Sequence, residues 1–259
     1  MIDQSEAFSS ITSGAFEPWK ATALSQLRDR LSAPSDFPCV FSQNAFSREK
    51  ALFSFVPDLT SGGFEIATED LRAYVRLSRA WDGSVANAEP LLMVFCPQTV
   101  RGETIEDFHR IGWQILQRWH DVDPSPWPEG VSMDPNSPFW SMCFDGMQLF
   151  VNMSNPCHHV RRSRNLGDAF TFVINPRERF DIVAGDNEHG RRVRTHIRHR
   201  VEKYDGIPHA LQLGSYEAGE LEWWQYGIVE DNRERLDRCP FEQRVTVREL
   251  ATRSGVHRP

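Results

Sequence analysis

A β-rich stretch in the middle of the chain constrains the fold more than any other segment. Two apolar runs, 139–144 and 147–153, flank the dipeptide Asp145-Gly146. An Asp-Gly pair between apolar runs favours a tight hairpin, because both turn residues must adopt positive φ. A further β-rich run, 169–174, comes after a short connection. The stretch therefore predicts a hairpin followed by a third strand.

The connection between the hairpin and the third strand is crowded with metal ligands and arginine. Stiff strands on both sides can hold such a loop so that its side chains point in a reproducible direction. Imidazole and thiolate groups bind iron, and guanidinium groups bind carboxylates in a forked geometry. Haem has both an iron and two carboxylates, so the pattern suits a haem site. The residues that carry it are Cys157, His158, His159, Arg161, Arg162 and Arg164.

Each of these residues also has a simpler interpretation. The adjacent His158 and His159 would point to opposite sides of a strand, so at most one of them would face a shared cofactor. A histidine pair is more often part of a satisfied polar loop than a ligand set. The arginines could form a solvated patch paired with acids such as Asp168 and Glu178. Cys157 could be a free cysteine that only packs against its neighbours.

Length and charge limit the class of protein. With 259 residues, 40% of them apolar, the chain can bury a substantial core. The formal net charge of -7 argues against a general nucleic-acid binder. The five cysteines form no CxxC pair, and no apolar run approaches the roughly 20 residues of a membrane helix. We therefore expect a cytoplasmic protein with reduced thiols and no membrane or nucleic-acid partner.

The rest of the chain predicts a single α+β domain over 15–245, with a mainly antiparallel sheet, a central hairpin and flanking helices. No internal repeat or break in composition divides it. Residues 1–14 are expected to be a flexible N-terminus and 246–259 a flexible tail. Helices are predicted over 16–31, 68–81, 104–120 and 190–204, and strands over 37–41, 51–56 and 91–95.

Other motifs add little chemistry. No P-loop, GxGxxG, GxSxG or HExxH pattern occurs, so nucleotide, hydrolase and zinc-protease readings have no support. His120 ends the strongest predicted helix, where an imidazole interacts favourably with the helix C-terminus. The other histidines have polar or basic neighbours and are expected at the surface: His109, His189, His196, His199, His209 and His257.

Several short segments together resemble the YqcI/YcgG family. They include FPC at 37–39, HDVDP at 120–124, PFW at 138–140, FVN at 150–152, RRSRNLG at 161–167, NPRERFD at 175–181 and CPF at 239–241, with shorter matches at Pro156, His158, 204–205 and 222–226. RRSRNLG followed by NPRERFD is the most specific. Family members with a known role are haem-dependent N-oxygenases. They hydroxylate a guanidine nitrogen of arginine in D-cycloserine biosynthesis, or of a cyclic arginine derivative in guanitoxin biosynthesis.

The resemblance implies a haem-dependent monooxygenase of antibiotic biosynthesis that converts free L-arginine to Nω-hydroxy-L-arginine. The cofactor would be haem b and the oxidant O2 or peroxide. With O2, two electrons must come from a separate reductase, because the chain has no flavin or nicotinamide fingerprint. The alternatives are a hydroxylase of another guanidino amino acid, a peroxidase-like haem protein, and a non-catalytic haem- or anion-binding regulatory protein that uses the Arg-rich loop and the helix 190–204.

The resemblance also suggests site residues. The family pattern has an Ala where this chain has Cys157, which disfavours a thiolate ligand and makes His158 the expected axial ligand. His120, in the other matching His segment, is the alternative. Arg161, Arg162 and Arg164 are expected to bind the haem propionates.

A guanidinium substrate needs carboxylates and aromatic walls in a partly dry pocket. Glu222, Trp223 and Asp231 are the expected substrate-binding residues.

Overall fold

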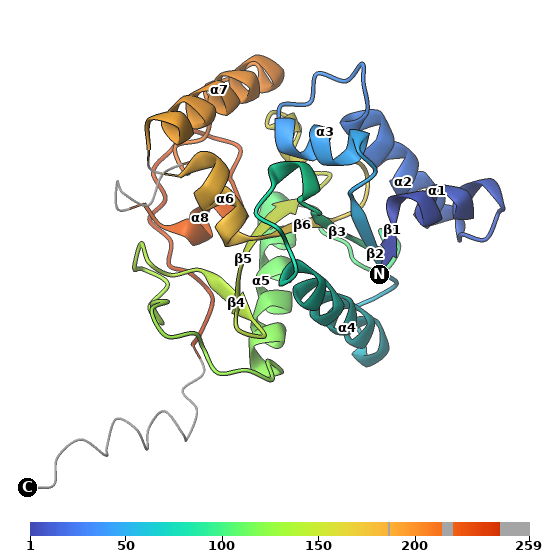
Figure 1. The fold of residues 1–259 in the computed structure, drawn as a ribbon, viewed down its shortest axis with the longest axis horizontal. Coiled ribbons are helices and arrows are strands. Elements are labelled where there is room, and N and C mark those ends of the chain that lie inside the picture. Colours follow the sequence, from blue (N-terminus) through green and yellow to red (C-terminus); the bar gives the residue numbers. More distant parts are fainter. Residues whose placement is uncertain (186, 214–219, 244–259) are drawn as a thin grey trace, which may run out of the picture.

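In the computed structural model, which describes residues 1–185, 187–213 and 220–243, strand β3 (Leu91–Phe95) lies at the centre of the sheet. All five of its residues are buried. Successive side chains of a strand point to opposite faces. Accordingly, the first, third and fifth side chains of β3 join one hydrophobic cluster, and the second and fourth join another. The sheet is therefore covered on both faces (Figure 1).

Five further strands complete the sheet: β1 (Ile2–Asp3), β2 (Leu52–Val56), β4 (Met142–Phe144), β5 (Met147–Ser154) and β6 (Thr171–Pro176). Their order across the sheet is β1-β2-β3-β6-β5-β4. Among the described strands, β2 and β3 pair in parallel and every other neighbouring pair is antiparallel. This open, mostly antiparallel sheet with flanking helices confirms the predicted α+β fold.

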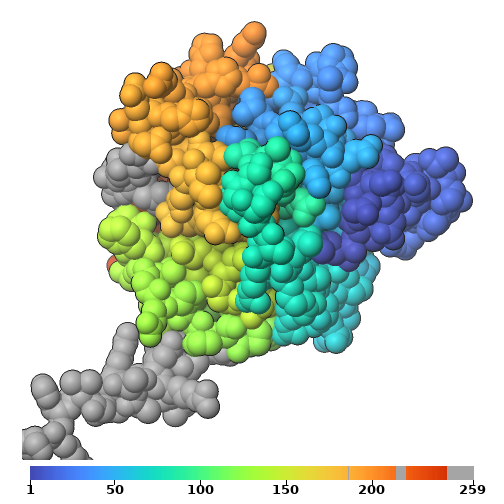
Figure 2. Space-filling view, in the orientation of Figure 1, coloured from blue at the N-terminus to red at the C-terminus, as the bar shows by residue number. Residues whose placement is uncertain are grey.

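The helices pack on the two faces of the sheet (Figure 1), and Figure 2 shows the surface of the molecule in the same orientation. They are α1 (Gln4–Thr12), α2 (Pro18–Leu31), α3 (Val40–Ser47), α4 (Ser61–Ser78), α5 (Ile105–Asp121), α6 (Arg177–Ala184), α7 (Glu188–Asp205) and α8 (Glu222–Tyr226), with short 3₁₀ helices at Val85–Asn87 and Arg162–Arg164. Helices α4, α5 and α8 contribute to the first cluster, and α1, α2, α3 and α7 to the second. No helix in the described part of the chain is both long and apolar enough to cross a membrane.

The hairpin and helix α5 form where the sequence predicts them. Asp145 and Gly146 join β4 to β5 with φ of 47° and 73°, as a tight hairpin turn requires. Helix α5 begins with a capping box, in which the Thr104 side chain accepts from the Asp107 amide and the Asp107 side chain accepts from the Thr104 amide. This reciprocal pair satisfies two amides that a helix start would otherwise leave open.

The N-terminal part differs from the prediction in three places. Residues 1–14, expected to be flexible, contain β1 and α1, because Asp3 caps the helix and Ala7 is fully buried. The segment 37–41, expected to be a strand, instead leads into helix α3, which begins at Val40. Helix α4 begins at Ser61, seven residues before the predicted start. Its first turn contains Gly62 and Gly63, and glycine is not a residue from which a helix would be predicted. The predicted tail 246–259 lies outside the described residues.

Candidate functional site

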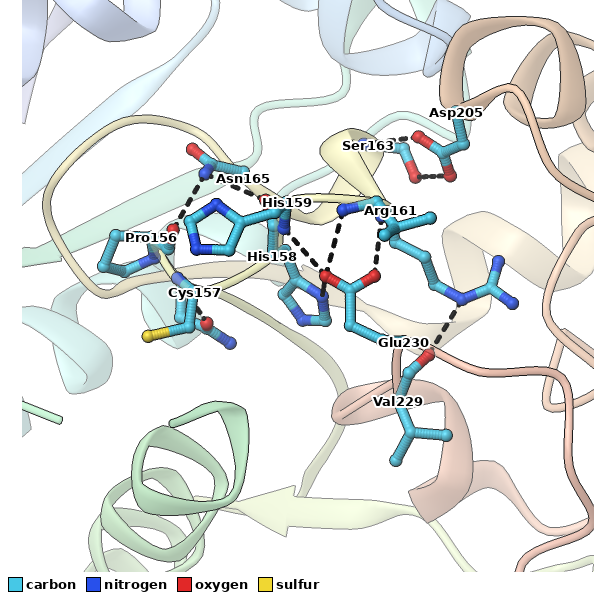
Figure 3. Close-up of polar contacts among 12 residues, drawn as sticks. Pro156, Cys157, His158, His159, Arg161, Ser163, Asn165, Asp205, Val229 and Glu230 are labelled. Carbon is cyan, nitrogen blue, oxygen red and sulfur yellow. Dashed lines mark hydrogen bonds and ion pairs between the residues drawn. The ribbon is translucent and has the colours of Figure 1, made fainter. Parts of the chain in front are cut away.

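The loop between β5 and β6 is closed by hydrogen bonds at its base. The Asn155 amide donates to the Arg164 carbonyl at 3.0 Å, which joins the two ends of the loop. Asn165 donates through Nδ2 to the carbonyls of Pro156 and His158, each at 3.2 Å (Figure 3). The loop is therefore well ordered between its strands, as a site that aims side chains requires.

Glu230, from the segment after α8, holds the tip of this loop (Figure 3). Its Oε1 accepts from the amides of His159 at 2.7 Å and Val160 at 3.2 Å, and its Oε2 accepts from the Arg161 amide at 2.8 Å. The same Oε1 lies 3.5 Å from Nδ1 of His158. One carboxylate thus binds three consecutive backbone amides and faces the imidazole that precedes them.

His158 points into the protein, whereas its neighbour His159 is exposed. The His158 side chain is only 1% exposed, and neither ring nitrogen has a hydrogen-bond partner among the described residues. Burial, followed by the positive charges of Arg164 and Arg161, lowers the pKa of His158 to about 3. Its imidazole is therefore neutral at pH 7, the form that binds a metal.

His109 of α5 lies opposite His158, with the two ring centroids 6.4 Å apart. It is 8% exposed, and its Nε2 has no partner in the described part of the chain. Burial, and then the neighbouring His158, lower the pKa of His109 to about 3. The expectation that His109 is a surface residue is wrong. It lies four positions after the buried Ile105 and four before the buried Trp113, so helical spacing could have placed it on the inner face.

Arg164 completes what we call the buried polar cluster, consisting of His109, His158 and Arg164. Burial lowers the pKa of Arg164 to about 10, and its Nη1 has no partner among the described residues. Its positive charge helps to lower the pKa of both histidines. Buried polar groups are nearly always hydrogen-bonded, and exceptions call for a bound ligand or ordered water.

Arg161 and Arg162 are engaged within the protein. Arg161 is buried and donates to the carbonyls of Val229 at 2.8 Å and Pro208 at 3.2 Å, and to the side chain of Asn232. Arg162 donates to the carbonyl of Tyr204, and its guanidinium lies 4.7 Å from the centroid of that ring. Of the three arginines expected at propionates, Arg161 uses all three guanidinium nitrogens within the chain, whereas Arg164 has a buried nitrogen, Nη1, that the described residues leave unpaired.

His120 lies away from this cluster. It is buried at the end of α5, where its ring packs 5.0 Å from Phe241 and 5.5 Å from Trp127, measured between centroids. At a rise of about 1.5 Å per residue, the eleven positions from His109 to His120 correspond to about 16 Å along the helix. The structure therefore does not bring His120 and His158 to one metal.

The residues expected to bind substrate lie in different environments and do not form one pocket. Glu222 is fully buried, accepts from Ser141 Oγ at 2.7 Å and pairs with Arg177 Nε at 2.9 Å. Trp223 is buried in the core, and Asp231 is on the surface. The carboxylate of Glu222 thus already has a guanidinium partner within the chain.

An open pocket of about 760 Å³ adjoins the buried polar cluster. One wall is α5, with His109 and Trp113, and the other is the segment from Val229 to Pro240. A cavity between α3, α6 and the sheet is smaller, about 140 Å³, and is lined by Cys39 and Arg179 among apolar groups. That size suits a molecule no larger than a single benzene ring, so the pocket beside His109 is the better seat for a large ligand.

Two further observations bear on the kind of metal site. In the described ranges no group of three or more His, Cys, Asp or Glu could hold a bare metal ion. A porphyrin supplies the equatorial ligands of its iron, so haem needs only axial ligands from the protein. Burial raises the pKa of the Cys157 thiol, and the nearby Asp107 and Glu106 add to this. Cys157 is therefore held as a neutral thiol, which is a poor iron ligand.

The arginines of α7 hold the neighbouring backbone. Arg200 donates to the carbonyls of Phe37 at 2.8 Å and Pro38 at 3.0 Å, and Arg198 donates to that of Leu213 at 2.5 Å. These bonds give the basic helix a structural role, which weakens the alternative of a helix exposed for an anionic partner.

Comparison with known proteins adds an independent line of argument. Residues 27–242 match the YqcI/YcgG family. The chain is 53% identical over 223 residues to a Streptomyces lavendulae protein named "Putative N(omega)-hydroxy-L-arginine synthase DcsA", an alignment that covers 86% of this chain and 84% of that protein. It is 30% identical to two Bacillus subtilis (strain 168) proteins, "Uncharacterized protein YcgG" and "Uncharacterized protein YqcI", over 86% of this chain and 88% and 87% of theirs. No solved structure matches the chain.

Proposed function

The chain belongs to the YqcI/YcgG family, and on that basis we propose that it is a haem-dependent enzyme that hydroxylates a guanidine nitrogen of free L-arginine, giving Nω-hydroxy-L-arginine. The substrate comes from the printed name of the Streptomyces lavendulae relative, which is 53% identical. The cofactor rests on the buried polar cluster. Its two facing imidazoles, with nitrogens that the described residues leave unpaired, are the single observation that carries the proposal.

The residues of the cluster fit a haem. His158 is neutral and buried, and its loop is held by hydrogen bonds at both ends, so in this proposal it would hold the haem iron. His109 is the second imidazole at the site, and the Nη1 of Arg164 is available to a propionate. A charge-assisted hydrogen bond of this kind contributes on the order of 1.5–3 kcal/mol. Haem, when bound there, supplies the activated oxygen, derived from O2 or peroxide.

The pocket beside α5 has the groups that free arginine needs. The guanidiniums of Arg233 and Arg238 line it and can bind a substrate carboxylate in forked geometry. Glu106, one turn before His109 on the same helix, lines it too and offers a carboxylate to a guanidinium. Trp113 gives it an aromatic wall. In this proposal these residues replace Glu222 and Asp231 as the substrate-binding set.

Both walls of the pocket carry charges of both signs: Glu106 and Arg110 on α5, and Arg233, Arg238, Glu234 and Asp237 on the facing segment. In this proposal Glu106 binds the guanidinium and Arg238 the carboxylate of the substrate, so that the guanidinium end lies against α5. His158 itself is buried, so its ring would be kept from solvent when it holds the cofactor.

The test is a turnover experiment with haem-loaded protein and L-arginine, using peroxide in one arm and O2 with a chemical reductant in the other. The expected product is heavier than arginine by one oxygen and co-elutes with Nω-hydroxy-L-arginine. L-Citrulline, which keeps the carboxylate and replaces the guanidinium by a neutral urea, is the control and should give no product. Bound haem without product from any guanidine would contradict the proposed reaction.

A further inference from the structure

Glu230 stands where a carboxylate can govern the state of His158. Its Oε1 is 3.5 Å from Nδ1 of His158, while both of its oxygens accept from the amides of the next three residues. Figure 3 shows the carboxylate beside the ring and below this backbone. Three backbone hydrogen bonds hold Glu230 in place, so the carboxylate is a fixed partner for the ring.

A neutral imidazole carries one proton, on Nδ1 or on Nε2. A carboxylate beside Nδ1 is an acceptor, so it favours the tautomer with the proton on Nδ1 and leaves the lone pair on Nε2. Nδ1 faces the Glu230 carboxylate at 3.5 Å, a charge contact rather than a hydrogen bond, whereas Nε2 has no partner among the described residues. Nε2 is thus left to bind a metal.

We propose that Glu230 is the positioning residue for His158: it sets the Nδ1–H tautomer and orients the ring so that Nε2 faces the cofactor. This rests on the proposed function for the identity of the cofactor, whereas the tautomer is a property of the protein alone. Histidine ligands generally donate their second N–H to such a partner, which fixes the ring and makes it a stronger donor to the metal.

The same carboxylate connects two distant parts of the chain. One is the loop between β5 and β6 that carries His158, which we call the ligand loop, and the other is the last part of the described chain. Glu230 follows α8 and lies 71 residues after His159, whose amide it binds. Arg161 doubles the connection by donating to the carbonyl of Val229. The segment that forms one wall of the substrate pocket is therefore tied directly to the ligand loop, so Glu230 joins the two halves of the site.

The first measurement needs no cofactor. In protein labelled with ¹⁵N at histidine, long-range ¹H–¹⁵N spectra at neutral pH report which ring nitrogen carries the proton. We expect His158 to be protonated on Nδ1, and in Glu230→Gln we expect the Nδ1 signal to move toward the unprotonated position. His158 found protonated on Nε2 in the wild-type protein would overturn the inference.

The second measurement uses haem-loaded protein. Glu230→Gln keeps the shape of the side chain and removes its charge, so we expect about tenfold to a hundredfold weaker haem binding and a more positive iron reduction potential. Glu65→Gln, an exposed glutamate on α4, is the charge-matched control and should leave both values unchanged. A Glu230→Gln protein with wild-type affinity and potential would overturn the inference.

The two arms separate the failure of this inference from that of the proposed function. If wild-type protein binds no haem, the proposed function fails and the tautomer measurement still decides the role of Glu230. If haem binds and Glu230→Gln behaves as wild type in both arms, the positioning role fails while the cofactor stands.

Discussion

His158 and His159 are neighbours in the chain with opposite environments in the structure. One imidazole is buried beside Glu230 and the other is in solvent. The sequence predicts that only one of two adjacent side chains faces a shared partner, and strand-like alternation gives the reason. It does not say which one. The choice of His158 came from the family resemblance, and its burial agrees with that choice.

Arg161 shows the limit of assigning roles from residue type. A loop rich in arginine suggests several propionate partners, but a guanidinium can satisfy backbone carbonyls equally well. The carbonyls that Arg161 binds belong to residues far along the chain. Their approach depends on the tertiary fold and leaves no local pattern in the sequence.

Arg161→Ala tests this structural role. The substitution removes a donor from the oxygens of Val229, Pro208 and Asn232 and empties a buried site, so we expect the free energy of unfolding to fall by about 2–4 kcal/mol. Urea denaturation measures it. Arg192→Ala removes an exposed helix arginine paired with Glu188 and should change that energy by no more than about 0.5 kcal/mol. An Arg161→Ala protein as stable as the control would mean that the buried hydrogen bonds contribute nothing measurable.

Helix α5 is the element on which the site depends. Its predicted range of 104–120, based on an apolar stripe, matches the observed helix, Ile105–Asp121, within a residue at each end. The prediction missed His109 by grouping it with the surface histidines, although Phe108 and Ile111 close to it in the sequence are apolar. Its helical neighbours four positions away are buried, which is the signal that periodicity provides. Polar residues on an inner face are rare enough to be read as site candidates.

Gly227, at the end of α8, makes room for His109. A Cβ at this position would lie 2.9 Å from both Cδ2 and Nε2 of the His109 ring. We therefore expect Gly227→Ala to displace the imidazole, lower the free energy of unfolding by about 1–3 kcal/mol and weaken haem binding. Thermal denaturation and haem titration measure the two effects.

Gly62→Ala is the matched control, because a Cβ there has no atom within 4 Å and alanine favours a helix. It should leave haem binding unchanged and stability equal or higher. Equal haem affinity in Gly227→Ala and Gly62→Ala would show that His109 has no part in the site.

At the scale of the whole molecule, the spacing of apolar residues predicted the fold class but not the order and direction in which the strands pair. The hairpin, the central strand and the main helices follow from local patterns. The placement of β6 between β3 and β5, and the parallel pairing of β2 with β3, depend on contacts between distant segments. The site has the same character, because the ligand loop, α5 and the segment at Glu230 meet only in the folded chain.

The substrate residues illustrate this scale most clearly. Glu222 and Trp223 are adjacent in the sequence, which suggested a guanidinium pocket. In the structure Arg177 supplies a guanidinium to Glu222 from within the chain. Whether a carboxylate is free for a ligand depends on which arginine the fold brings to it, and a single sequence does not contain that information.

The central claim is that His158 holds a haem iron, and the absorbance of purified protein tests it most directly. After reconstitution with haem, wild-type protein and His159→Ala should show the same Soret band at one haem per chain. His158→Ala should lose the band or show it greatly weakened, with its fold confirmed by circular dichroism. A folded His158→Ala protein with an unchanged Soret band would contradict the account.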